Sequence, residues 1–253
     1  MTPANKNNLQ GFVPAVVTPF TADGEIMYDA FQDLIQWLIS IGAQGICVAA
    51  DNGESWTLST EERAALTRLA VKTSEGKTPI YTGATATQNA NTVKNAIAAT
   101  EAGASGLLIM PQTYVLKASQ AELINRFEMV TQATNLPIII YNSPRRVGFS
   151  LHLSDLDAIL NVANVIGIKE SHRDFFHHTH LLEKFSEKLS IMIGPCHYIF
   201  PGIALGAKGF IATGPELLGS QAGQLTELAL EKPGPLQAQL HYKLTRIYEM
   251  LMS

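Results

Sequence analysis

The chain has 253 residues, of which 46% are hydrophobic, and it carries a formal net charge of -4. This size allows one large core or two small ones, and the mildly acidic charge gives no sign of binding to nucleic acid or to a membrane surface. The apolar runs are too short for a transmembrane helix, and the polar segment 1–10 lacks a signal-peptide core. Two cysteines far apart in sequence, Cys47 and Cys196, favour a reduced, cytoplasmic protein.

Short apolar runs alternate with longer amphipathic stretches along the whole chain. The predicted strands are Phe12–Val17, Gly45–Ala49, Pro79–Gly83, Gly106–Met110, Pro137–Tyr141, Val165–Lys169, Ser190–Gly194 and Gly209–Thr213. The predicted helices are Tyr28–Ser40, Thr60–Thr73, Gln88–Glu101, Ser119–Thr131, Leu153–Leu160, Phe175–Ser186, His197–Leu205, Leu217–Leu230 and Leu236–Met252. Eight strand–helix units are typical of a (β/α)8 barrel, or TIM barrel, of about 250 residues.

Local signals support these boundaries. Ser59 precedes one predicted helix and Ser119 begins another; both are N-cap candidates, the latter with the spacing of a capping box. Gly42, Gly103 and Gly206 end helices just before the next strand, as expected of a C-cap. A doubly wound open sheet is the rival fold. It would place a glycine-rich loop after the first strand, where this chain has Thr18–Thr21. We therefore predict an α/β barrel over 1–230 that carries the active site, and a short C-terminal helical extension over 231–253.

Lys169 and Tyr141 close two neighbouring predicted strands. At the edge of a dry core, burial disfavours an ammonium and favours the neutral amine, which attacks carbonyls and forms a Schiff base. Neighbouring strands lie about 4.8 Å apart, so a phenol on the next strand can reach the same carbonyl carbon and transfer protons. Taken alone, each residue also fits an ordinary position at the rim of a barrel.

Other polar residues follow the strand ends. Arg146, after a proline-stiffened turn, is a candidate for binding a carboxylate in bidentate fashion, or else a surface residue. Gly53 permits tight backbone geometry, and free N–H groups in its loop could hold a carboxylate. In the loop after the sixth strand, His172 or Arg173 could bind a second polar or acidic group of the substrate. Alternatively, this loop is a plain helix start capped by Asp174.

Three histidines, His177, His178 and His180, lie close together on a predicted helix. We interpret them as part of a solvated helix face rather than as ligands. No spacing typical of a zinc site occurs, so no metal is predicted.

The sequence resembles the dihydrodipicolinate synthase / N-acetylneuraminate lyase family from about Gly11 to Gly214. The matching motifs are Thr18-Pro19-Phe20, Gly53-Glu54-Ser55, Tyr141-Asn142-x-Pro144 and Gly167-Ile168-Lys169-Glu170. The resemblance implies a (β/α)8 barrel, a class I Schiff-base mechanism on pyruvate or another 2-keto acid, and a homo-oligomer, either a dimer or a tetramer built from two tight dimers. It makes Lys169 the Schiff-base lysine and Tyr141 the proton shuttle. Arg146 then matches a carboxylate-binding arginine, and Ile211 matches a residue whose backbone lines the keto-acid pocket.

The sequence also departs from that family. Asp51 and Asn52 stand where the family has hydroxyl residues, and the charge of Asp51 would repel a nearby carboxylate. Thr113 aligns with a relay tyrosine that the family contributes across the dimer interface, and Tyr114 is one position away. About three helices usually follow the barrel, whereas here one is found; the extension is either truncated or shorter in this lineage.

The leading hypothesis is a cytoplasmic class I lyase or aldolase that forms a Schiff base on Lys169 with a 2-keto acid, its one expected small-molecule partner. The reaction is aldol cleavage, condensation or dehydration, and the iminium is the electron sink, so no metal or organic cofactor is expected. Substrate-binding candidates are Asp51, Asn52, Gly53, Arg146, Thr113, Tyr114 and Ile211. One alternative is dihydrodipicolinate synthase itself, and another is a catalytically silent paralogue that binds a keto acid.

Overall fold

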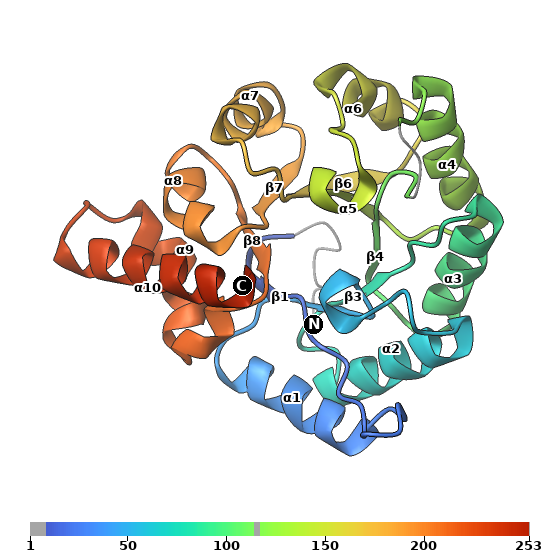
Figure 1. Cartoon of the computed structure of the whole chain (residues 1–253), viewed down its shortest axis with the longest axis horizontal. Coiled ribbons are helices and arrows are strands. Elements are labelled where there is room, and N and C mark those ends of the chain that lie inside the picture. The colour runs from blue at the N-terminus through green and yellow to red at the C-terminus, as the bar shows by residue number, and fades with distance from the viewer. Residues whose placement is uncertain (1–8, 114–116, 253) are drawn as a thin grey trace.

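In the computed structural model, residues 9–113 and 117–252 are described, and they form a parallel barrel surrounded by helices (Figure 1). The strands are β1 (Gly11–Pro14), β2 (Ile46–Val48), β3 (Ile80–Gly83), β4 (Gly106–Ile109), β5 (Ile138–Asn142), β6 (Val165–Glu170), β7 (Ser190–Ile193) and β8 (Gly209–Ala212). The helices are α1 (Tyr28–Ser40), α2 (Thr60–Ser74), α3 (Asn89–Glu101), α4 (Gln120–Ala133), α5 (Pro144–Val147), α6 (Leu153–Leu160), α7 (Phe175–Phe185), α8 (Ile199–Ala204), α9 (Gln221–Leu230) and α10 (Pro235–Met252). The predicted (β/α)8 barrel is confirmed.

The sheet closes on itself between its first and second strands. Its order is β1-β8-β7-β6-β5-β4-β3-β2, with every pair parallel. A parallel bridge between Ala15 and Cys47 joins β1 to β2, and the N–H of Val16 donates to the carbonyl oxygen of Cys47 at 3.0 Å. At the β1–β8 seam, a Cβ on Gly209 would lie 2.2 Å from the carbonyl oxygen of Gly11, so only glycine fits there.

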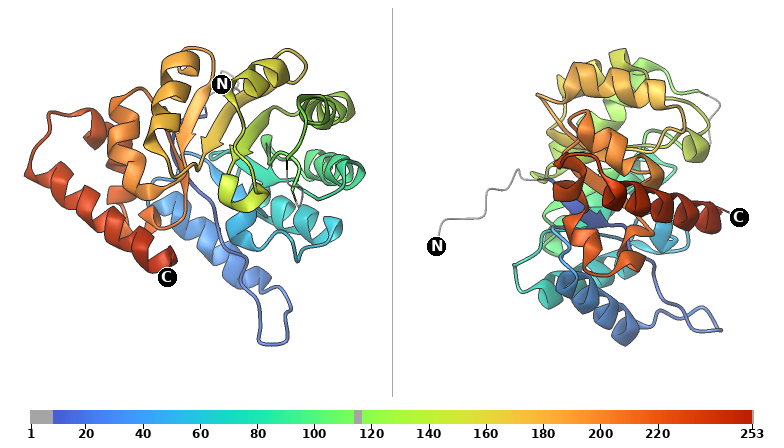
Figure 2. Two further views of the ribbon diagram at one scale, coloured as in Figure 1. Left: turned by 45° about the horizontal axis from the view of Figure 1, so that its top comes forward. Right: turned by 90° about the vertical axis from the view of Figure 1, so that its left-hand side faces the viewer.

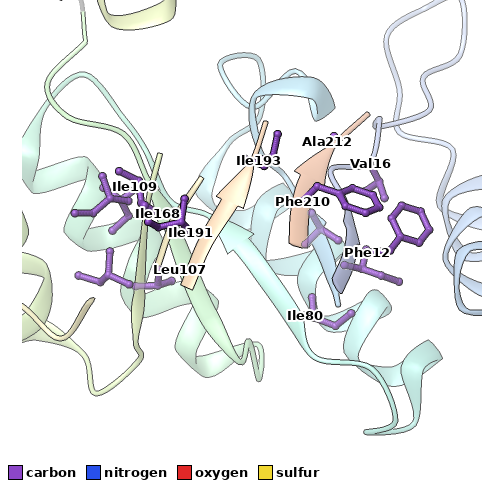
Figure 3. Packing of buried hydrophobic residues seen from close by; sticks show 14 of the residues in the cluster. Phe12, Val16, Ile80, Leu107, Ile109, Ile168, Ile191, Ile193, Phe210 and Ala212 are labelled. Carbon is purple, nitrogen blue, oxygen red and sulfur yellow. The ribbon is translucent and has the colours of Figure 1, made fainter. Parts of the chain in front are cut away.

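Side chains alternate between the two faces of the barrel wall. Leu107 and Ile109 of β4 point outward and pack against the helices, whereas Leu108 between them points inward. Figure 3 shows the outward set, which includes Ile168. The next residue along β6 is Lys169, so alternation directs its side chain into the barrel.

Caps fix the helix ends where the sequence predicted them. Ser59 and Ser119 each form a capping box, with Glu62 and Glu122 respectively. Gly42, Gly103 and Gly206 have φ values of 95°, 89° and 106°, the left-handed conformation that favours glycine after a helix.

The first strand ends at Pro14 rather than at the predicted Val17, the short helix α5 was not predicted, and two predicted helices begin differently. The helix predicted at Leu217–Leu230 is a short 3-10 turn, Pro215–Leu218, followed by α9, because Gly219 has φ 59° and interrupts the helical path. The helix predicted at His197–Leu205 begins as a 3-10 turn, Cys196–Tyr198, before α8.

Helix α10 runs along the outside of the barrel beside α8 and α9 (Figure 2). Its last turn lies near β8 and β1 at the centre of Figure 1. Among the described residues, no helix combines the length and the apolar character needed to cross a bilayer.

Candidate active site

A cavity of about 320 Å³ opens at the carboxyl ends of the barrel strands. Tyr141 from β5, Lys169 from β6 and Ile211 from β8 line it, together with Asp51 and Asn52 from the loop after β2. In (β/α)8 barrels this end carries the reactive groups, since the loops that follow the strands meet there. The structure therefore brings together both predicted catalytic residues and four of the predicted binding residues, since Arg146 also lines this cavity.

Lys169 and Tyr141 are direct neighbours across the β5–β6 ladder. The Nζ atom of Lys169 lies 4.2 Å from the centroid of the Tyr141 ring, and the two residues are only 2% and 5% exposed. Within the described part of the chain, no acidic side chain lies within ion-pair distance of this amine. A substrate carbonyl in the cavity could thus meet an amine and a phenol at the same place.

Asp51 forms an ion pair with Arg146 at the side of the cavity. The Nε of Arg146 donates to Oδ2 of Asp51 at 2.8 Å, and Asp51 is 6% exposed whereas the arginine side chain is 39% exposed. The pair commits one edge of the guanidinium to a protein carboxylate, and the terminal nitrogens remain for a ligand. It also compensates the charge of Asp51, which the sequence alone presents as a repulsive group.

Asn52 and Gly53 fix the loop that carries Asp51. The side chain of Asn52 donates to Thr213, whose hydroxyl donates to the carbonyl oxygen of Ala15 at 2.6 Å. The N–H of Gly53 donates to the carbonyl oxygen of Ala50 at 3.0 Å within the 3-10 turn Asp51–Gly53. The turn itself therefore uses the Gly53 amide, which is not one of the free N–H groups that could hold a carboxylate.

Gly53 contributes close packing instead. A Cβ at this position would lie 2.9 Å from the carbonyl oxygen of Val16, and Thr18 donates to the Gly53 carbonyl at 2.8 Å. Gly53 is absent from the cavity lining. Thr113 lines a second, adjoining cavity of about 790 Å³. Tyr114 lies outside the described residues.

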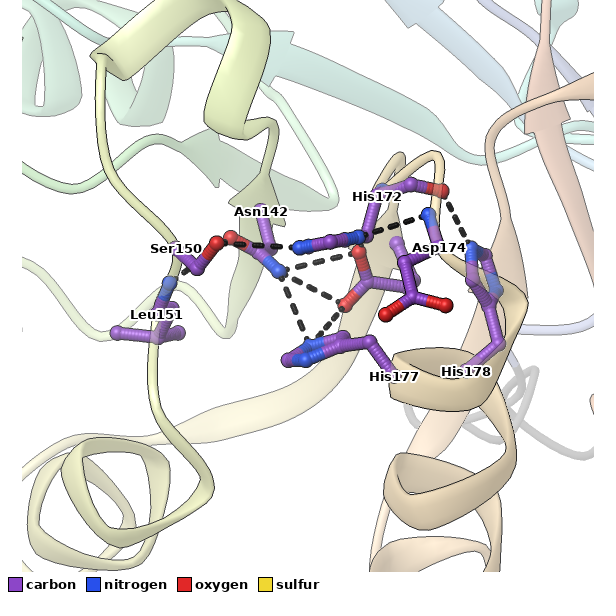
Figure 4. Close-up of polar contacts among 8 residues, drawn as sticks. Asn142, Ser150, Leu151, His172, Asp174, His177 and His178 are labelled. Atoms are coloured by element: carbon purple, nitrogen blue, oxygen red, sulfur yellow. Dashed lines mark hydrogen bonds and ion pairs between the residues drawn. The ribbon is translucent and has the colours of Figure 1, made fainter.

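A buried carboxylate, Glu170, follows Lys169 at the end of β6, and Figure 4 shows the polar cluster of Asn142, His172 and His177 to which it belongs. Glu170 is 0% exposed; both of its oxygens accept hydrogen bonds from the side-chain amide of Asn142, at 3.0 and 2.9 Å. Its Oε1 also accepts the backbone N–H of His172 at 2.7 Å, and Oε2 lies 3.3 Å from Nε2 of His177. Asn142 and Glu170 pair in register directly after Tyr141 and Lys169, so this cluster ties the ends of β5 and β6 together.

The histidine interpretation made from the sequence is wrong for two of the three residues. His178 is fully buried and its Nε2 lies 2.7 Å from the carbonyl oxygen of His172, which it meets as a donor. His177 is 16% exposed and meets Glu170; only His180 is well exposed. Burial lowers the pKa of His178. Burial acts in the same direction on His177, but hydrogen bonding to Glu170 and its negative charge outweigh it, so the pKa of His177 is raised.

The raised pKa of His177 predicts a pH-dependent contribution to stability. A group whose folded-state pKa is raised stabilises the fold fully below its ordinary pKa of about 6.5, and this contribution is lost as pH rises through the folded-state value. We expect His177→Gln to cost on the order of 1 kcal/mol of unfolding free energy at pH 6, and less at pH 9. Denaturant unfolding of both proteins across this range measures the difference. A difference that grows with pH would contradict the pairing.

Several cavity residues carry no signal in the sequence. Trp56 is 65% exposed and borders both cavities. Tyr248, Leu251 and Met252, from the last two turns of α10, also line the first cavity. Nothing in their sequence context distinguishes them from other exposed residues of an amphipathic helix.

Both cysteines are buried and unpaired, in agreement with the sequence interpretation. Burial raises the pKa of the Cys47 thiol to about 11 and that of Cys196 to about 12, so neither is poised as a thiolate. Among the described residues, His, Cys, Asp and Glu side chains form no group of three that could hold a metal ion.

This fold and site define a (β/α)8-barrel enzyme whose strand ends present a buried lysine beside a tyrosine. The dihydrodipicolinate synthetase family model matches residues 8–253, and the chain belongs to that family. It is 30% identical over 244 residues to 4-hydroxy-tetrahydrodipicolinate synthase of Neisseria meningitidis serogroup B, covering 96% of this chain and 83% of the relative.

Solved structures give the same result. Dihydrodipicolinate synthase from Aquifex aeolicus superposes with a TM-score of 0.88 at 30% identity, covering 96% of this chain and 83% of that one. The chloride-inhibited dihydrodipicolinate synthase from Acinetobacter baumannii, complexed with pyruvate, gives 0.89 at 25% identity with the same coverage. The resemblance inferred from the sequence motifs is confirmed.

Proposed function

We propose that this protein is a class I lyase that forms a Schiff base between Lys169 and pyruvate or another 2-keto acid. One observation carries the proposal. The Lys169 amine is buried inside the cavity at the barrel mouth, 4.2 Å from the centroid of the Tyr141 ring. The pyruvate complex of the Acinetobacter baumannii relative supports the choice of ligand.

In the proposed mechanism, the unprotonated Nζ of Lys169 attacks C2 of the keto acid and a carbinolamine forms. Tyr141 delivers a proton to the carbinolamine oxygen, water leaves, and an iminium remains. The iminium withdraws electrons from C3. Loss of a C3 proton gives an enamine for condensation, whereas breakage of the C3–C4 bond releases an aldehyde, and elimination at C3–C4 releases water.

The substrate carboxylate would lie near Asn52 and Ile211, with Arg146 at the side of the cavity. Arg146 can donate from its terminal nitrogens while Nε stays bonded to Asp51. We thus propose Asp51 as the residue that orients Arg146, and Arg146 as the group that contacts substrate.

Reductive trapping tests the proposal. Incubation with pyruvate and borohydride is expected to reduce the iminium to a stable secondary amine, located at Lys169 by peptide mass mapping. A panel of 2-keto acids in place of pyruvate extends the test. An unmodified Lys169 across the whole panel would refute the proposal, and binding without trapping would indicate a silent keto-acid-binding protein instead.

Dihydrodipicolinate synthase activity is the second candidate, and the name of the 30% identical Neisseria relative favours it. It predicts condensation of pyruvate with aspartate semialdehyde, observed by coupling to the downstream reductase. Thr113, in place of a relay tyrosine, and Asp51, in place of a hydroxyl, weigh against it.

The proposal also includes the cellular compartment and the oligomeric state. A reduced cytoplasmic protein is supported by the two buried, free thiols. A homo-oligomer, dimer or tetramer, is proposed from the family, and light scattering of the purified protein measures it.

A further inference from the structure

The cavity is rich in positive charge that the proposed chemistry leaves unused. Four cationic side chains line it, Arg145, Arg146, Lys169 and Arg173, and Asp51 is the one acid among its described lining residues. Asp51 is already paired with Arg146, and Lys169 is the proposed nucleophile. Arg145 and Arg173 therefore remain as uncompensated cations at the cavity.

In residues 9–113 and 117–252, neither of these two arginines forms an ion pair with a carboxylate. Among the described residues, the Arg145 side chain forms its hydrogen bond with the uncharged Sδ of Met252, at 2.9 Å from Nη1. Asp174, beside Arg173 in sequence, uses Oδ1 to accept the N–H of Phe176 at the start of α7. Two planar guanidinium groups thus face the cavity with donors available for an anion.

Buried side chains hold the backbone of His172, on the N-terminal side of Arg173. The N–H of His172 donates to Glu170 at 2.7 Å, and its carbonyl oxygen meets Nε2 of His178 at 2.7 Å (Figure 4). Both acceptor and donor are fully buried residues. The backbone just before Arg173 is therefore anchored to the interior of the protein.

The backbone of Arg173 and of the residue that follows it is held by hydrogen bonds as well. The carbonyl oxygen of Arg173 itself accepts the hydroxyl of Tyr198 at 2.7 Å, and the N–H of Asp174 donates to Nδ1 of His172 at 2.9 Å. A loop whose backbone groups are satisfied by side chains from β6, α7 and the turn before α8 is ordered before a ligand arrives. Preorganisation of this kind lowers the cost of binding and is typical of a loop that presents a ligand-binding residue.

We propose that Arg173, together with Arg145, binds a second carboxylate at the end of the substrate remote from the carbonyl that Lys169 attacks. The substrate class is then a dicarboxylic 2-keto acid, an inference that rests on the proposed Schiff-base function. A neutral sugar chain would leave both guanidinium groups without a counter-charge. The cavity of about 320 Å³ lies at the small end of the range for ligand sites and suits a short diacid.

Two pairs of keto acids, each pair of equal chain length, test this assignment. 2-Oxoglutarate and 2-oxopentanoate both have five carbons and differ in the distal carboxylate; 2-oxoadipate and 2-oxohexanoate form a second pair one carbon longer. Affinity is measured by calorimetry and by the concentration dependence of borohydride trapping. We expect the diacid of at least one pair to bind about tenfold more tightly than its monoacid, and the preference to shrink at high salt.

Substitutions test which arginine is responsible for the tighter binding of the diacid. Arg173→Gln is expected to bring the ratio of diacid to monoacid affinity close to one while monoacid binding is unchanged, and Arg145→Gln to reduce it in part. Arg173→Lys, which keeps the charge but loses the fork, should retain part of the preference. Arg246→Gln, an exposed position on α10 outside the cavity lining, is the control and should behave as wild type.

The outcomes separate the inference from the function on which it rests. Trapping of pyruvate with equal affinities for diacid and monoacid in both pairs overturns the dicarboxylate assignment alone. A preference that survives in Arg173→Gln overturns the role of Arg173. Failure to trap any keto acid overturns the Schiff-base function and the inference with it.

Discussion

Replacement of Lys169 by alanine is expected to abolish adduct formation and to lower kcat/KM by at least about a thousandfold. Without the amine there is no covalent intermediate and no iminium to accept electrons from C3, and the remaining groups contribute binding only. Turnover of the best substrate in the keto-acid panel gives the rate, and mass spectrometry after borohydride treatment gives the adduct. Turnover and adduct formation should be lost together, because both depend on Nζ of Lys169.

Two further variants make this result interpretable. Lys169 is 2% exposed, so Lys169→Met, which preserves side-chain volume, guards against a loss of activity through a packing defect. Lys208→Ala removes an exposed lysine just before β8, at the opposite end of the barrel, and should leave the rate unchanged. Retention of more than about a tenth of the activity in either Lys169 variant would rule out the Schiff-base mechanism.

The sequence was sufficient to predict the barrel and the proximity of Tyr141 and Lys169. Apolar runs and helix caps define the strand–helix units locally, and parallel strands in chain order leave little choice of neighbours. Once β5 and β6 are adjacent, Tyr141 and Lys169 lie side by side because each is the same step from its strand end. Alternation along β6, with Ile168 outward, then directs the amine into the barrel.

The remainder of the site depends on side-chain directions in loops, which no period in the sequence encodes. Asp51 and Arg146 are 95 positions apart and meet only because the loops after β2 and β5 converge. The three histidines fit a helix face by spacing, but that face of α7 is turned toward Glu170 by the β6–α7 loop. The sequence also does not predict that the Gly53 amide is used by its own turn, because glycine permits both open and closed turns.

Glu170→Ala is expected to be the most destabilising single change in this site, at about 3–5 kcal/mol of unfolding free energy. Removal of the carboxylate leaves the fully buried Asn142 amide and the partly buried His172 N–H without this acceptor, and it leaves His177 without its counter-charge. Breaking a buried pair by deleting one partner typically has a cost of this size. Denaturant unfolding monitored by circular dichroism measures it.

Matched variants separate the loss of the charge from the loss of the side chain. Glu170→Gln keeps the shape and one oxygen acceptor, so it should cost less than alanine. Glu187→Ala removes an exposed glutamate and should stay within about 0.5 kcal/mol of wild type. If Glu170→Ala also stays within that margin, the cluster does not hold the strand ends together.

The effect of Glu170 on chemistry can be separated from its effect on folding. In Glu170→Gln, at a temperature where the protein remains folded, the rate of pyruvate trapping on Lys169 is expected to fall about tenfold. The reason is positional: Glu170 and Asn142 fix the register of β5 against β6 one residue beyond the Lys169–Tyr141 pair, and a small displacement of a reacting atom is costly in rate. An unchanged trapping rate in a less stable protein would show that the cluster serves the fold and not the alignment of the amine with the phenol.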